Sequence, residues 1–434
     1  MAPQPQHPMQ TPLLSRRHLL RAAGAAAVAG VAAPLVAGCA GAPKQGAGGK
    51  TFTVYWNAGH AYQAYEKVIS EFEKAHGVTV NLQKYQWPDM RTRVLADFAS
   101  GNVPDVIEEG GGWVKEFAVT GDALSLQKYV DQDGEKMGFP DDWQPSTIDR
   151  NSHNGDVYGI QMHLTCNLLL FNRQMLDKAG VEPPTTWDDM VDAAKELTRG
   201  GVHGIALNQD HQYSGPWMLQ NGVREFDPET KQVLTPRDAA VEALQFQSDL
   251  IHKHKVSPVP PPGTDYSGPQ KLLSANRAAM ILTGPWDLAP IDKSSPDLDL
   301  GIAPALSHKK QATIAAGTSL FVPAKAKQPD LSWDFIKRIT ALKTETAVTK
   351  EAGMLMPRVS WTKDPVVAED QRTKAFADGL EYAVDRYADL AATGQLGKVQ
   401  ELYKTLYQGV VIKGQPVEKA VSEYAAAVEK MLAD

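Results

Sequence analysis

The sequence predicts an α/β fold with a parallel sheet, in a chain long enough for two domains. Residues 51–56, 78–82 and 104–107 have strand patterns, and amphipathic helical segments that stop at Gly77 and Gly101 separate them. Strands that alternate with helices imply a parallel sheet covered on both faces. About 400 residues remain once a predicted signal is removed, which is enough for two domains with sizeable cores.

The first segment of the chain is interpreted as a targeting signal and not as part of the fold. Arg16 and Arg17 precede residues 22–38, which carry no charge and end in Val36-Ala37-Gly38-Cys39. This ending resembles a lipobox, in which the cysteine thiol accepts a diacylglycerol. We therefore expect a signal peptide at 1–38 and a lipidated tether at 39–50, which places the protein on the extracytoplasmic face of the cell membrane.

Two alternatives concern the same segment. A membrane-spanning helix is disfavoured, because a span needs about 20 strongly apolar residues and this run consists mostly of small ones. The twin arginines resemble the Tat export signal, although Sec export also tolerates such a start, so both routes stay open.

Charge and cysteine content narrow the class of protein. The formal charge of −7 becomes −10 once the three arginines of residues 1–38 are removed, which disfavours nucleic acid as a partner. Cys166 is the only cysteine besides Cys39. No internal disulfide is therefore expected, and packing must hold the fold together.

The middle of the chain continues the α/β pattern. Residues 157–171 form an irregular apolar run, read as two strands that meet at a crossover. Thr186 and Asp189 form a capping box that begins a helix, and a strand at 204–207 follows it. Pro236 at a first helical position predicts another long helix through Leu250.

The last third begins with three strands and ends in helices. The strands are expected at 278–282, 301–303 and 319–322. The first of them runs into Gly284-Pro285-Trp286, where glycine and proline stop the ladder and present an aromatic side chain. Helices broken at Gly353 and Pro357 follow, and an amphipathic helix over 417–432 ends the chain.

Several short motifs occur in one characteristic order. They are Pro104-Asp105-Val106 followed by Trp113, Tyr158-Gly159-Ile160, the segments 169–173 and 183–188, Ala278-Ala279-Met280 leading to Gly284-Pro285-Trp286, and 333–337. In this order and spacing the chain resembles the extracellular solute-binding proteins of the maltose-binding type, which serve ABC sugar importers. The resemblance covers essentially the whole chain after the signal.

The resemblance implies two α/β lobes joined by several crossings of the chain, with a ligand cleft between the lobes. Lobe 1 is expected at 51–163 and 319–354, and lobe 2 at 164–318 and 355–434. Crossings are expected near 163–165, 318–320 and 353–356, and Gly317 and Gly353 suit the backbone rotation of a hinge.

A sugar site needs flat aromatic platforms for C–H faces and directed polar groups for hydroxyls. The residues expected to bind ligand from lobe 2 are Trp286 first, then Tyr213, His211 and Trp217. Packing is an equal alternative for Tyr213 and the favoured one for Trp217. Loops that follow the first-lobe strands offer more, because open α/β sheets bind ligands at the carboxyl ends of their strands. The expected contacts there and at the crossings are Asn57, His60, Glu109, Trp113, Thr165, Gly317, Thr318 and Arg358, with a solvated side chain as the alternative for the last.

Two departures from the family pattern bear on the ligand. The triple glycine 110–112 replaces charged and aromatic sugar contacts found in some relatives, and Thr165 stands where some relatives carry an acid. Maltose itself is therefore doubtful, and neither the identity nor the length of the sugar follows from the sequence.

The predicted function is that of a substrate-binding component of an ABC carbohydrate importer. It would act as a monomer without metal or cofactor, and it would deliver sugar to permease subunits driven by a separate ATPase. A lipid-anchored exported enzyme acting on glycans is the alternative. Ser125-Leu126-Gln127-Lys128 has the spacing of a penicillin-binding enzyme, but no K-T-G motif accompanies it, so no enzymatic activity is expected.

Overall fold

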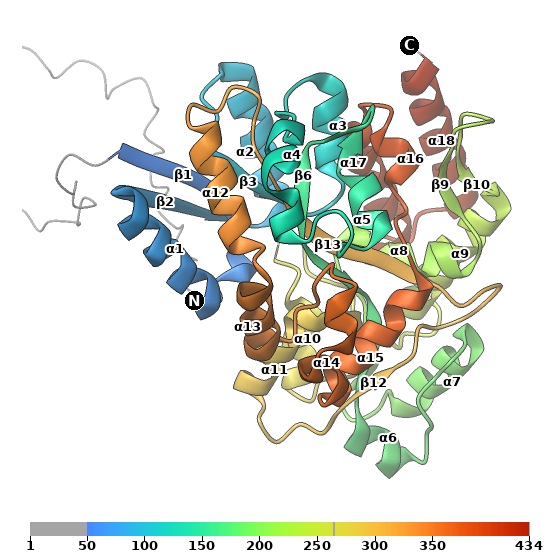
Figure 1. Ribbon diagram of the computed structural model, residues 1–434. Coiled ribbons are helices and arrows are strands. Elements are labelled where there is room, and N and C mark those ends of the chain that lie inside the picture. Colours follow the sequence, from blue (N-terminus) through green and yellow to red (C-terminus); the bar gives the residue numbers. More distant parts are fainter. Residues whose placement is uncertain (1–49, 264, 434) are drawn as a thin grey trace, which may run out of the picture. The chain divides into compact units, whose positions relative to one another are not determined.

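The structure is a computed structural model, and it describes residues 50–263 and 265–433 (Figure 1). Two main sheets organise these residues. The first contains β1 (Lys50–Asn57), β2 (Val78–Tyr85), β3 (Val106–Glu109), β6 (Gly159–Cys166), β13 (Thr313–Phe321) and β14 (Ala383–Val384). The second contains β7 (Leu168–Asn172), β8 (His203–Ala206), β11 (Ala278–Thr283) and β12 (Leu300–Ala303).

The first sheet has the parallel core that the alternating pattern predicts. Strand β1 pairs in parallel with β2 on one side and β3 on the other. Helices α1 (Gln63–His76) and α2 (Trp87–Ser100) connect these strands, and each ends at a left-handed glycine, Gly77 and Gly101. Phe52 and Val54 on β1 are completely buried, because helices cover the faces of the sheet. The predicted α/β class is confirmed.

The second sheet is mixed. Strand β11 runs parallel to β8 and antiparallel to β7, and β12 pairs antiparallel with β7. Every residue of β7 and β11 is buried, which explains why these segments are continuous apolar runs instead of alternating ones. The capping box of Thr186 and Asp189 forms as predicted and begins α7 (Trp187–Leu197).

The two sheets are joined where β6 leads into β7 through Asn167. Strand β6 also forms a long antiparallel ladder with β13, whose register shifts between Thr318 and Ser319. Gly317 lies beside this irregularity with φ +152°, and a Cβ atom there would stand 2.1 Å from the carbonyl oxygen of His163. The position therefore requires glycine for both conformation and space.

The remaining helices pack on one sheet or the other. Helices α12 (Pro329–Ile339) and α13 (Leu342–Ala352) pack against α1, whereas α18 (Val417–Ala433) packs against α9 (Arg237–His252) and α17 (Leu396–Tyr407). The other α-helices of the described residues are α3 (Trp113–Thr120), α4 (Gln127–Met137), α5 (Pro145–Arg150), α6 (Arg173–Ala179), α8 (Gly215–Gln220), α10 (Gly268–Ser274), α11 (Leu288–Ser294), α14 (Pro365–Ala368), α15 (Gln371–Gly379) and α16 (Ala388–Ala391).

Two observations concern the membrane. None of the helices in residues 50–263 and 265–433 combines the length and the apolar composition that a bilayer crossing requires. The predicted signal peptide and Cys39 lie outside the described residues.

A candidate ligand cleft between the two sheets

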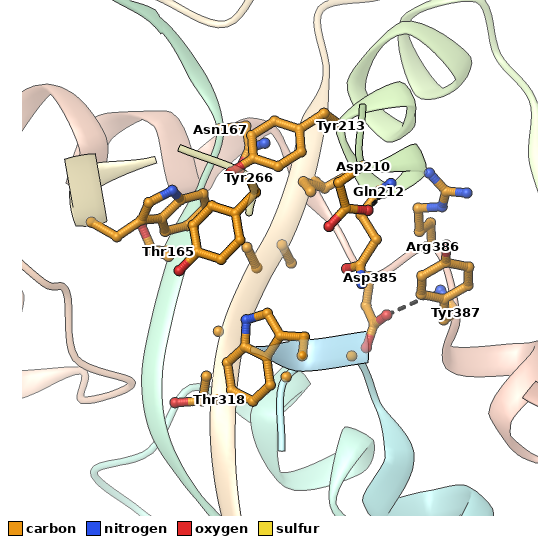
Figure 2. Close-up of a pocket in the computed structure, with 18 of the residues that line it drawn as sticks. Thr165, Asn167, Asp210, Gln212, Tyr213, Tyr266, Thr318, Asp385, Arg386 and Tyr387 are labelled. Atoms are coloured by element: carbon orange, nitrogen blue, oxygen red, sulfur yellow. Dashed lines mark hydrogen bonds between the residues drawn. The ribbon is translucent and has the colours of Figure 1, made fainter. Parts of the chain in front are cut away.

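A cavity with about 880 Å³ of open space, part of it open to solvent, lies between loops that follow strands of both sheets and the joining strands β6 and β13. Figure 2 shows Asp210, Gln212 and Arg386 at one end, with Tyr266 and Thr318 toward the other. The cavity is lined by His60, Trp87, Gly110, Gly111, Arg150, Thr165, Asn167, Asp210, Gln212, Tyr213, Tyr266, Trp286, residues 314–318, Met354, Asp385, Arg386 and Tyr387.

Aromatic side chains supply much of the wall. The rings of Tyr213 and Trp286 meet edge to face, with 6.5 Å between their centroids. The indole of Trp286 lies so close over Gly284 that a Cβ atom there would be 2.2 Å from the ring. Gly284 therefore ends strand β11 and also makes room for the indole. Trp87 stands in the same relation to Gly110, where a Cβ atom would come within 2.7 Å of its ring.

Several buried polar atoms on this wall have no partner within the described chain. They include the Trp286 Nε1 donor, the Thr165 hydroxyl and the Asn167 amide oxygen. Buried polar atoms in folded proteins nearly always form hydrogen bonds, so unpartnered groups that face one cavity mark it as a place for a polar ligand or for water.

The end of the cavity at Asp385 and Arg386 carries charges of both signs. Arg386 forms an ion pair with buried Glu225, and its guanidinium lies 4.5 Å from the centroid of the Tyr387 ring. Arg150 Nε lies 3.7 Å from a carboxylate oxygen of Asp385. Because each cation stands beside an anion, this end offers strong hydrogen-bonding groups without a large excess of either charge.

Asp210 is the other acid of the cavity. Its carboxylate accepts a hydrogen bond from the backbone N–H of Gln212 at 3.0 Å. Burial raises the pKa of Asp210 above its usual value, while that hydrogen bond works in the opposite direction.

A side chamber of about 650 Å³ shares Trp87, Asp210 and Gln212 with the main cavity. The Nε2 atoms of His211 and Gln400, both on this chamber, are buried and have no partner within the described residues. A second space with unpartnered polar atoms therefore adjoins the main cavity at Trp87, Asp210 and Gln212.

The structure brings together half of the residues that the sequence nominated for ligand binding. His60, Thr165, Tyr213, Trp286, Gly317 and Thr318 line the main cavity. His211 and Trp113 line only the side chamber, where the guanidinium of Arg91 lies 5.0 Å from the Trp113 ring centroid.

Two residues of the first-sheet loops are turned away from the cavity. Asn57 is fully buried, and its side chain accepts from the N–H of Gly59 to begin the short helix after β1. Glu109 is fully buried as well, and it accepts from the backbone N–H groups of Gly111 and Trp113. Both side chains hold the loops in shape, and neither lines the cavity.

Trp217 and Arg358 are also away from the cavity. Trp217 is 1% exposed and packs against Trp187 and Phe246, so the packing alternative describes it. Arg358 is 4% exposed, and its guanidinium is bound to Glu345 and to the carbonyl oxygen of Thr340. Its place on the crossing after β13 indicated a cleft contact, but the buried carboxylate of Glu345 holds it in the interior.

The sequence reasoning missed several residues of the cavity wall. Asp210 and Gln212 stand next to the nominated Tyr213, and a wider reading of that loop would have found them. Trp87 begins a helix directly after a strand, a position that favours the ligand edge of an α/β sheet. No local signal marks the others, which come from distant parts of the chain: Arg150, Asn167, Tyr266, Asp385, Arg386 and Tyr387.

Two α/β sheets joined by crossing strands, with an aromatic and polar cleft between them, define a two-lobed binding protein. The chain belongs to the family of bacterial extracellular solute-binding proteins, whose family model matches residues 40–342. The resemblance drawn from the motifs and the two-lobed fold expected from it are confirmed.

Relatives and solved structures agree with this assignment. The arabinooligosaccharide-binding protein of Bacillus subtilis is 24% identical over 318 residues, which cover 70% of this chain and 72% of the relative. The GacH receptor of Streptomyces glaucescens, solved without ligand and with acarbose, has a TM-score of 0.78 at 24% identity and covers 89% of this chain and 99% of its own. A solute-binding protein of an ABC transporter from Thermotoga lettingae, bound with α-D-tagatose, also has a TM-score of 0.78 at 24% identity, over 88% of this chain and 100% of its own.

Proposed function

We propose that this protein captures a carbohydrate for an ABC importer and releases it unchanged to the permease subunits. The observation that carries the proposal is the cleft itself, where the faces of Trp286 and Tyr213 stand beside buried polar atoms without partners. A sugar ring has apolar C–H faces and a rim of hydroxyls, so it satisfies both kinds of surface at once.

Closure of the cleft would provide the signal for delivery. Loops that follow strands of both sheets line the cavity, so a bound sugar contacts both sides only in a closed arrangement. The sugar then binds the closed form more tightly and shifts the population toward it. The permease would recognise this form, and a separate ATPase would supply the energy of transport.

The same proposal includes the cellular setting. Export by the segment 1–38 and acylation of Cys39 would hold a monomeric receptor at the outer face of the cell membrane, close to its permease. The receptor would need neither cofactor nor catalytic residues, and its ligand would leave chemically intact.

We expect Trp286→Ala to weaken sugar binding by about 1–3 kcal/mol, because the variant loses a stacking face and its Nε1 donor. A thermal-shift screen of mono- and oligosaccharides would first identify a ligand, and calorimetry would then compare the variant with the wild type. Trp333→Phe is the matched control, since Trp333 stacks on Tyr129 away from the cavity. Full affinity in Trp286→Ala would remove this residue from the site, and hydrolysis of the sugar would support the enzyme alternative.

Because the side chamber adjoins the main cavity, we expect affinity to rise with the length of the sugar. Gln400→Ala should weaken binding of a trisaccharide about three- to tenfold and leave a monosaccharide unaffected, because only the longer ligand reaches the unpartnered Nε2 of Gln400. Calorimetric titration with glucose, maltotriose, arabinose and arabinotriose would measure this. Equal losses for short and long sugars would show that the chamber is not part of the ligand site.

A further inference from the structure

We infer that Tyr65 and His163, which do not line the cavity, make the Thr318 hydroxyl a hydrogen-bond donor toward the ligand. This inference rests on the proposed function and adds a specificity element to its site. It concerns two positioning residues, because only Thr318 of the three faces the open space.

The three side chains form one chain of hydrogen bonds. The Tyr65 hydroxyl lies 2.7 Å from His163 Nε2, and His163 Nδ1 lies 3.1 Å from the Thr318 hydroxyl oxygen. Tyr65 and His163 are 1% exposed, and Thr318 is 5% exposed at the cavity wall. Thr318 lines the cavity, and the register of β13 shifts directly after it, between Thr318 and Ser319.

The direction of these bonds follows from the proton of Tyr65. Within the described residues the Tyr65 hydroxyl has no other side-chain partner, so its proton is satisfied only if it is donated to His163 Nε2. The imidazole then carries its own proton on Nδ1 and donates it to the Thr318 oxygen. Thr318 in turn is left with a free O–H that points to the ligand.

The relay requires a neutral His163 and a protonated Tyr65, and the burial of both side chains favours these states. Burial lowers the pKa of His163 well below its usual value, and nearby His60 acts in the same direction, so the imidazole is neutral. Burial raises the pKa of Tyr65 well above its usual value, so the phenol keeps its proton. Because Nε2 of this neutral imidazole accepts from Tyr65, the single ring proton of His163 is on Nδ1.

A second hydrogen-bonded pair, Glu108 and His60, reaches the same wall. Glu108 is fully buried and accepts from His60 Nδ1 at 2.5 Å and from the N–H of Asn57 at 2.8 Å. The His60 proton that Glu108 accepts is thereby held on Nδ1, and His60 lines the cavity wall. His60 and His163 are neighbours, with 5.1 Å between ring centroids, so the two hydrogen-bonded groups meet on one wall.

The same cluster could be taken for a metal site, because ligand atoms of His60, Glu108 and His163 lie within 4.8 Å of one another. However, both nitrogens of His163 and Nδ1 of His60 already have hydrogen-bond partners. A metal ion would have to break these bonds, because a nitrogen of His163 cannot bind a metal and keep its hydrogen bond in the relay.

The tautomer of His163 tests the inference without any ligand. Two-bond ¹H–¹⁵N correlation spectra of the ¹⁵N-labelled protein, assigned by comparison with His163→Asn, should show a protonated Nδ1 and an unprotonated Nε2. Tyr65→Phe should shift His163 toward the other tautomer, while Tyr129→Phe, which loses a hydroxyl bonded to Asp330, should not. A protonated Nε2 in the wild type, or zinc binding that is lost in His163→Asn, would overturn the inference.

A double-mutant cycle tests the consequence for binding. With maltotriose and arabinotriose as probes, Thr318→Val and Tyr65→Phe should each weaken binding about three- to tenfold. The double variant should bind no more weakly than Thr318→Val, because Tyr65 acts only through that hydroxyl. Additive losses would contradict the relay. If neither sugar binds the wild type, the choice of ligand in the proposed function fails, and the tautomer experiment still decides the inference.

Discussion

Replacing Arg358 with alanine should lower the free energy of unfolding by about 3–5 kcal/mol, the usual cost of breaking a buried ion pair from one side. The Arg358 guanidinium binds Glu345 at 3.3 Å and the carbonyl oxygens of Met137 and Thr340 at 2.7 Å. It also lies 3.6 Å from the centroid of the Trp143 ring. All of these contacts are lost together in the variant.

The largest part of the cost comes from the partner that stays behind. Glu345 is 1% exposed, and burial raises its pKa well above the usual value while Arg358 opposes that change. Without the guanidinium the variant must either bury an unpaired carboxylate or bind a proton.

Urea denaturation of the wild type and the variant measures the effect. Adding Glu345→Gln to Arg358→Ala should recover part of the loss, because the uncompensated charge is removed. Arg173→Ala is the control, since Arg173 is about half exposed, pairs with exposed Asp299, and should cost less than about 1 kcal/mol. Equal losses for the two arginines would contradict the anchoring role of Arg358.

The anchor also matters for function. Backbone hydrogen bonds join Gln144 to Pro357 and Val359 to Asp142, so Arg358 and its neighbours hold the segment after α13 against the first-sheet side of the molecule. This is the third of the expected crossings. We expect its loss to weaken ligand binding only indirectly, through a less well-defined cleft.

Asp287→Asn should stabilise the protein at pH 8 and flatten the dependence of stability on pH between about 4 and 7. Burial raises the pKa of Asp287 to about 7, although its carboxylate accepts a hydrogen bond from the Thr283 hydroxyl at 2.7 Å. The folded protein thus prefers the protonated acid, whose contribution is full below the unfolded pKa of 3.8 and is lost as pH rises through about 7.

The size of this effect follows from the difference between the two pKa values. About three pH units correspond to at most ~4 kcal/mol at pH 8, and asparagine avoids this cost because it has no charge to bury. Denaturation midpoints at a series of pH values would measure it, with Asp299→Asn at a half-exposed surface pair as control. A slope between pH 4 and 7 that stays unchanged in Asp287→Asn would show that another group titrates there.

Local patterns predicted the elements that depend on local physics. The helix ends at Gly77 and Gly101, the capping box of Thr186 and the glycine-stopped strand before Trp286 all occur where they were expected. Each depends on side-chain and backbone groups only a few residues apart, and such contacts leave a mark in the sequence.

Burial of polar residues was less predictable. Nothing local distinguishes Arg358, which is held by Glu345, from an arginine in a cleft. Asn57 and Glu109 follow strands at the ligand edge of the sheet, as a contact residue would, yet each turns back to a backbone N–H a few residues away. Position at an edge indicates a site, but it does not determine the direction of a side chain.

The sequence by itself determined the α/β class, the family and the aromatic centre of the cleft, because periodicity, turn residues and ordered motifs are properties of neighbouring residues. Only the tertiary structure decided which polar groups surround that centre. Asp385 and Arg386 line the same cavity as Asp210 and Arg150, which lie more than 170 residues earlier in the chain. The Tyr65 to Thr318 relay joins residues on α1, β6 and β13. Such contacts depend on how the sheets are joined, and residues that are neighbours in the sequence carry no signal of how distant segments are joined.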